Sequence, residues 1–260
     1  MERENMDEGN VWKRCLPHKY LQRTCRWGTG LCVVVLLAAG IRLLVTITLL
    51  LTTYVLWTRK ILFLFTAQAV LTFSMAMQLA AYVRLWKKRK RQTETSLTQG
   101  LQLLTAAHIG KAVWCMMMIG ICWWIGSRPV LLSFYYQTLH ITARDLILLG
   151  CLLSGWLLVY LFKVFSLCMI RKSMLGKRHP SLITLRLTSC AIILQYLWLV
   201  VFSAVILLGK TEWPVLLGTV PFLLLLFFYY LDAAGCYYNL SVRLIKYLGK
   251  ERSHNVSIHP

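Results

Sequence analysis

The chain has 260 residues, of which 58% are apolar and only 15% are charged, and its net charge is +20. Soluble domains contain about 45–50% apolar and about 25% charged residues, so the composition is typical of a membrane protein. The basic residues stand between long apolar runs, where cytoplasmic loops carry them, and not on a soluble basic domain. We therefore expect no nucleic-acid partner.

About six apolar runs are long enough to cross a bilayer. Backbone groups in hydrocarbon need partners within their own segment, so these runs are expected to be helices. The predicted fold class is an all-α, polytopic membrane helical bundle. It divides into a basic N-terminal segment (1–27), a transmembrane domain (28–238) and a basic tail (239–260). The predicted spans cover roughly 28–57, 61–84, 101–125, 145–170, 182–209 and 214–238.

The N-terminal segment is charged throughout and lacks the apolar stretch of a cleaved signal peptide, so the first span should act as its own targeting signal. Cys25 stands next to this span. A cysteine there is a candidate for palmitoylation, with a plain thiol as the alternative. Arg42 falls near the middle of the span, where a charge is costly.

Five consecutive basic residues directly follow the second span: Lys87, Lys88, Arg89, Lys90 and Arg91. In this place the run is expected to set the orientation and to contact anionic lipids of the cytosolic leaflet. The alternative is a nuclear localisation signal, which the run resembles in composition.

Lysine and arginine alternate between abundant and scarce from one connection to the next. They are abundant in the N-terminal segment, after the second and fourth spans, and in the tail. The positive-inside rule places these parts in the cytosol, together with both chain ends. The sequons at Asn239 and Asn255 would then face the cytosol and should carry no glycan.

Several ionisable residues fall inside the later spans, where such residues are functional candidates by default. His108 and Lys111 are three apart on the third span and should share a face. Lys163 lies in the fourth span and Asp232 in the sixth. Together with Arg42 they have similar predicted depths on four helices, and cations outnumber the one acid. A polar intramembrane site made from them would favour an anionic ligand: a phosphate, a carboxylate, chloride or a lipid head group.

A structural explanation of these charges stays open. Lys163 can extend its ammonium group to the inner surface, and Lys111 can pair with Asp232 to fix helix packing. Gln68, Gln78 and Gln195 are further polar candidates for a lining. Small residues, among them Gly110, Gly150 and Gly235, are expected to let helices approach closely.

The sequence contains no HExxH, GxSxG or P-loop motif, so an enzyme is not the favoured prediction. Its nine cysteines show no metal-ligand spacing, and none falls in a predicted outer connection. We therefore expect neither a metal nor another cofactor. The predicted function is a small channel, transporter or lipid-handling protein. The alternative is a non-catalytic assembly factor, regulatory subunit or scaffold with a membrane-protein partner. Plasma membrane and endomembranes are not distinguished.

Overall fold

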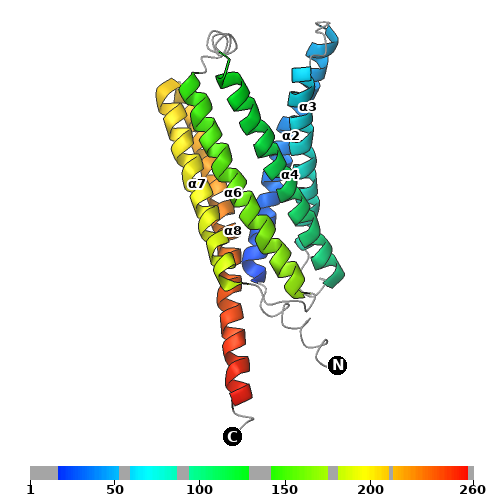
Figure 1. The fold of residues 1–260 in the computed structure, drawn as a ribbon, viewed down its shortest axis with the longest axis vertical. Helices are drawn as coiled ribbons and strands as arrows, with labels where there is room; N and C mark the ends of the chain where they lie inside the picture. Colours follow the sequence, from blue (N-terminus) through cyan, green and yellow to red (C-terminus); the bar gives the residue numbers. More distant parts are fainter. Residues whose placement is uncertain are drawn as a thin grey trace.

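The structure is a computed structural model that describes residues 17–52, 59–86, 94–128, 142–174, 181–210 and 213–256. These residues form six α-helices and no strand (Figure 1). The all-α prediction is therefore confirmed for the described part of the chain. The helices are α2 (His18–Thr52), α3 (Arg59–Leu85), α4 (Glu94–Gly126), α6 (Ala143–Met174), α7 (Leu182–Lys210) and α8 (Trp213–Val256).

Five of the predicted spans fall within one of these helices, and the first does so as far as Thr52, because residues 53–57 lie outside the described part of the chain. Five stretches are long and apolar enough to cross a membrane: His18–Ile41, Leu97–Gly126, Ala143–Ser173, Leu182–Val201 and Leu223–Lys246. The chain therefore has the helices that a multi-pass membrane protein requires. α3 is not among the five, and the count of six crossings remains a prediction.

Two helices extend farthest beyond their predicted spans. α2 begins at His18, within the segment that the sequence placed before the first span, and α8 continues past the predicted tail boundary to Val256. In both places the helix continues through a segment that contains basic residues. Arg23 and Arg26 on α2 and Arg243 on α8 are exposed, so their charged groups reach outward while the backbone stays helical.

The six helices pack side by side as a closed ring. Along the chain α2 contacts α3, α3 contacts α4, α4 contacts α6, α6 contacts α7, and α7 contacts α8, which packs against α2 again. Since successive helices run in opposite directions, α2 begins at the end of the bundle where α8 leaves it (Figure 1). We call this the basal end; α8 projects beyond it.

The surface of the ring is apolar and its interior is partly polar. Large apolar side chains are exposed on every helix, for example Leu37, Phe73, Met116, Leu158 and Ile183. Long polar side chains are instead among the buried residues, which reverses the distribution of a soluble protein. The buried polar or charged residues with long side chains are Gln78, His108, Lys111, Lys163 and Gln195. Lipid in place of water around the bundle accounts for this arrangement.

Glycines allow two of the closest helix contacts. A methyl group at Gly110 of α4 would overlap Ser74 of α3, and one at Gly28 of α2 would overlap the ring of Tyr82. At Gly235 the added carbon would stand 3.0 Å from the ring of Tyr20. Gly150 has open space beside it. Close approach at small residues is thus found at Gly110 and Gly235 and not at Gly150.

Candidate functional site

Three of the predicted site residues belong to the buried faces of α4 and α6. On α4 the buried positions recur every three or four residues, and this stripe includes His108 and Lys111. Lys163 takes the corresponding place on α6, between Tyr160 and Leu167. His108, Lys111 and Lys163 are respectively 4%, 8% and 6% exposed. Lys163 therefore does not extend its ammonium group to the surface in this structure.

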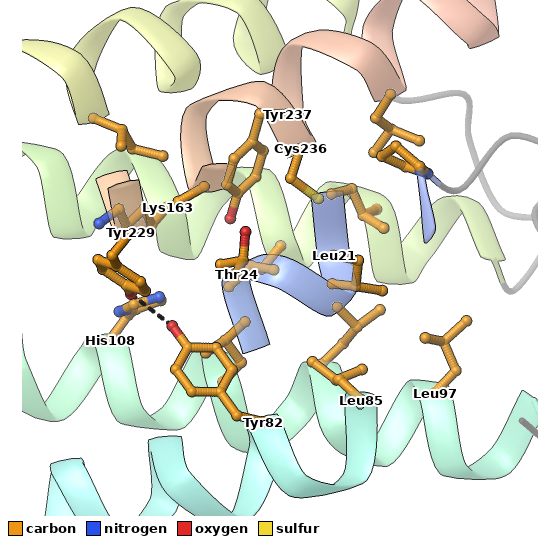
Figure 2. Close-up of a pocket in the computed structure, with 18 residues that line it drawn as sticks. Leu21, Thr24, Tyr82, Leu85, Leu97, His108, Lys163, Tyr229, Cys236 and Tyr237 are labelled. Carbon is orange, nitrogen blue, oxygen red and sulfur yellow. Dashed lines mark hydrogen bonds between the residues drawn. The ribbon is translucent and has the colours of Figure 1, made fainter. Parts of the chain in front are cut away.

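Lys111 is bound to an amide, which is itself bound to a pair of tyrosines. Its Nζ donates a hydrogen bond to Oε1 of Gln78 on α3. The amide Nε2 of Gln78 donates to the hydroxyls of Tyr82 and Tyr229, at 2.6 Å and 3.3 Å. These two hydroxyls share a further hydrogen bond of 2.6 Å (Figure 2). The network joins α3, α4 and α8.

Lys163 forms a hydrogen bond to a second amide, which belongs to another helix of the bundle. Its Nζ donates to Oε1 of Gln195 on α7 over 3.2 Å. The same nitrogen lies 5.6 Å from the ring centroid of Tyr160 and 5.7 Å from that of Tyr230. Both distances are typical of cation–π contacts.

Tyr160 is the common neighbour of all three residues. Lys111 Nζ lies 5.9 Å from its ring centroid, and the imidazole of His108 stacks on it with a centroid separation of 5.8 Å and an interplanar angle of 22°. The two lysines and His108 thus gather around one tyrosine ring. We call His108, Lys111, Lys163 and Tyr160 the cationic centre.

The cationic centre has more hydrogen-bond donors than acceptors. An ammonium group has three N–H donors. Within the described residues each lysine makes one hydrogen bond, to a neutral amide, and neither forms an ion pair. A buried charge that is not balanced carries a large desolvation cost. The geometry therefore leaves N–H donors of both lysines without a partner in the described structure.

Asp232 does not supply that partner. The core-facing residues of α8 include Tyr230, Ala233 and Tyr237, whereas Asp232 lies off this stripe and is partly exposed. The cation whose charge acts on it is Arg23 of α2. The predicted similarity in depth therefore did not place Asp232 on the same buried face as the lysines. The alternative of an ion pair between Lys111 and Asp232 is not found among the described residues. The side chain of Arg42 and the basic run 87–91 lie outside the described residues.

A cavity of about 80 Å³ leads from the cationic centre toward the basal end. All six helices contribute to its wall. His108, Lys163, Tyr82 and Tyr229 gather at one end, and leucines such as Leu97 line the other (Figure 2). Two lining residues have a buried polar atom without a hydrogen-bond partner in the described structure: Nδ1 of His108 and Oγ1 of Thr24.

A second hollow of about 480 Å³ lies between α6 and α7 on the outside of the ring. Apolar side chains such as Leu158, Leu194 and Trp198 form most of it. Trp156 Nε1 and Gln195 Nε2, from residues of the same lining, are also buried without a partner among the described residues. Gln195 therefore connects this hollow with Lys163.

The sequence alone did not single out the tyrosines. Tyr82, Tyr160, Tyr229 and Tyr230 complete the polar interior, although only the charged residues and glutamines were proposed for it. Helical spacing offers a partial signal, since Tyr82 follows Gln78 by four residues and Tyr160 precedes Lys163 by three. The Cys25 thiol is fully buried, which favours the plain-thiol alternative to palmitoylation.

No group of three or more His, Cys, Asp or Glu residues that could hold a metal ion occurs in the described part of the chain. Comparisons with protein-family models, with curated proteins and with solved structures found no match. The function is therefore argued from the geometry of the chain itself.

Proposed function

We propose that this multi-pass membrane protein binds an anionic ligand at the cationic centre and serves as a small transporter, channel or lipid-handling protein. One observation carries the proposal: Lys111 and Lys163 are both buried around Tyr160, and their described contacts include no carboxylate. A carboxylate, phosphate or chloride would supply acceptors for the remaining N–H donors. Hydrogen bonds to charged groups contribute about 1.5–3 kcal/mol each, so two of them contribute about 3–6 kcal/mol to the free energy of binding.

The proposal includes a topology of six crossings with both chain ends in the cytosol. Described basic residues are more numerous near the basal end, whereas Arg59, Lys60, Arg128, Arg144 and Lys210 stand at the opposite end. This distribution supports a cytosolic basal end, from which the ligand would enter the cavity. The run 87–91 would contact anionic lipids on that side. The basal residues are Lys19, Arg23, Arg26, Arg84, Arg171, Lys172, Arg186, Arg243 and Lys246.

The experiment uses the purified chain in nanodiscs of uncharged lipid. Thermal unfolding is followed in sodium chloride, phosphate or acetate, each compared with sodium gluconate at the same ionic strength. A ligand that binds only the folded state raises the melting temperature as its concentration exceeds Kd. We expect such a rise for at least one of the three small anions.

The rise should disappear in the double variant Lys111→Met/Lys163→Met. It should persist in Lys246→Met, which removes an exposed lysine of α8. A melting temperature that is the same in all four salts, or an equal rise in the double variant, contradicts anion binding at this site. Uptake of the binding anion into proteoliposomes then separates a transporter from a protein that only holds its ligand.

A second candidate function is a non-catalytic assembly factor or scaffold, and the hollow between α6 and α7 supports it. Two buried N–H donors, at Trp156 and Gln195, lack partners beside a lipid-facing apolar surface. A transmembrane helix with a hydroxyl, amide or carboxyl group at this depth would satisfy them. A stoichiometric partner that co-purifies with the wild type and is lost in Leu194→Trp would favour this candidate. No loss with Ile109→Trp, on the lipid-facing side of α4, is the matching control.

A further inference from the structure

The cavity beside the cationic centre has two chemically different ends. Its polar end is formed by His108, Lys163, Tyr82 and Tyr229, and its other end mostly by leucine and isoleucine side chains (Figure 2). Thr24, Cys236 and Tyr237 line the part between the two ends (Figure 2). A bare inorganic anion would contact only the first of these ends. The apolar part of the wall comprises Leu21, Leu85, Leu97, Leu101, Leu104, Leu167, Ile170, Ile192 and Leu240.

Water does not explain the apolar end well. Cavities lined only by aliphatic side chains remain dry, because a water molecule there lacks hydrogen-bond partners. An ion moving along the leucines would likewise lose its hydration without replacement. An aliphatic chain, in contrast, gains free energy for each methylene group that leaves water.

We infer that the anionic ligand is an amphiphile, in which a carboxylate or phosphate head lies at His108 and Lys163 and an aliphatic chain follows the leucine wall. This inference rests on the proposed anion binding and specifies its ligand class. The unpartnered Nδ1 of His108 and Oγ1 of Thr24 line the cavity from two different helices, α4 and α2. A head group with several oxygens offers partners to both. The chain could come from a bilayer lipid or from a soluble organic acid, since both present the same chemistry.

The cavity is bounded, so the contribution of the chain must have a limit. Its volume of about 80 Å³ leaves room for a short chain only, and Leu85 and Leu97 lie at its basal part. Affinity should therefore increase with chain length and then stop increasing. Leu101 stands along this wall, one helical turn before Leu104 on α4.

The test measures the Kd of acetate, butanoate, hexanoate and octanoate for the wild-type chain in nanodiscs of uncharged lipid. Titrations of empty nanodiscs are subtracted to remove partitioning into lipid. The expected result is a Kd that falls by up to about fourfold per methylene group and then becomes constant. Hexanol should bind at least about tenfold more weakly than hexanoate, because it lacks the charge that pairs with Lys163.

Two substitutions at one position test the wall. Leu101→Phe should shorten the series, so that affinity stops rising at a shorter chain, and Leu101→Ala should lengthen it. Ile109→Phe is the control on the same helix, since Ile109 is 49% exposed on the outer surface and should leave the series unchanged. If one Leu101 variant fails to fold, the other still tests whether the chain length at which affinity stops rising changes in the expected direction.

The outcomes separate this inference from the function on which it rests. Acetate or phosphate binding that needs Lys163, with no gain along the series, keeps the anion site and overturns the amphiphile. Hexanoate that binds Lys163→Met as tightly as the wild type also overturns it, because its head group would then not lie at Lys163. If no anion binds, both proposals fall. Competition of octanoate by a lysophosphatidic acid with a six-carbon chain would show that a lipid head group fits the polar end, whereas octanoate binding without this competition would identify a soluble acid; each result supports an amphiphilic ligand.

Discussion

Tyr160 gathers two ammonium groups and an imidazole around one aromatic ring in the interior of the bundle. In place of water, each lysine amino group contacts one amide oxygen and the ring of Tyr160. Position in the sequence could predict that Lys111 and Lys163 lie within the membrane. It could not predict that both would face Tyr160, because the relative rotation of α4 and α6 depends on packing along their whole lengths.

The first prediction concerns the stability cost of the lysines. We expect Lys111→Met and Lys163→Met each to unfold at the same or a higher temperature than the wild type when no ligand is added. Replacing buried charged groups by apolar side chains of similar volume is often neutral or stabilising by about 1–4 kcal/mol. Thermal unfolding in uncharged nanodiscs measures this, with Lys246→Met as the exposed control. A large loss of stability would show that the lysines serve the fold itself.

The second prediction concerns the hydroxyl pair of Tyr82 and Tyr229. Each change to phenylalanine should destabilise the bundle by about 0.5–1.5 kcal/mol, since it removes a shared hydrogen bond and a partner of Gln78. The double variant should cost less than the sum of the two, because both single changes remove the same bond. Chemical unfolding of the four proteins gives the coupling energy. Tyr238→Phe, at an exposed position of α8, should change nothing, and strict additivity would contradict the network.

At the scale of the elements, hydropathy was sufficient to place the helices and insufficient to orient them. The predicted fifth span, about 182–209, nearly coincides with Leu182–Lys210. α2 begins before the predicted first span, because exposed residues such as Arg23 and Arg26 are compatible with a helix that continues past the membrane, and the span boundary itself stays a prediction. Asp232 was grouped with the cations by depth, whereas it lies off the core-facing stripe of α8 and is partly exposed.

The third prediction concerns the contact between α3 and α4 at Gly110. The change Gly110→Ala should destabilise the bundle by about 1–3 kcal/mol, since the new methyl group overlaps Ser74. Adding Ser74→Ala should restore part of the loss by removing the nearest atom. Gly120→Ala on the same helix has open space and should be neutral or stabilising through helix propensity alone. If Gly110→Ala behaves like Gly120→Ala, the two helices do not approach as the structure shows.

At the scale of the whole molecule, the closed ring explains why polar side chains can be buried in a bundle that exposes leucine and phenylalanine. Each helix turns an apolar face outward, and the ring encloses the few groups that lipid cannot solvate. Composition predicted this class, because apolar residues exceed the share found in soluble domains. The closure of the ring by α2 and α8 could not be predicted, since these helices are the farthest apart in sequence.

The fourth prediction tests the topology, because opposite ends of the ring must face opposite sides of the membrane. A glycosylation acceptor tag with flexible flanks, inserted after Ser127 at the end of α4, should be modified when the protein is expressed in mammalian cells. The same tag after Pro260 should remain unmodified, and so should the natural sequons at Asn239 and Asn255. The side chain of Asn239 already bonds the backbone oxygen of Gly235 at 2.8 Å within α8. Gel shifts before and after glycosidase treatment measure the modification. A glycan at the C-terminal tag would place the basal end outside the cytosol, and the cavity would then open toward the opposite compartment.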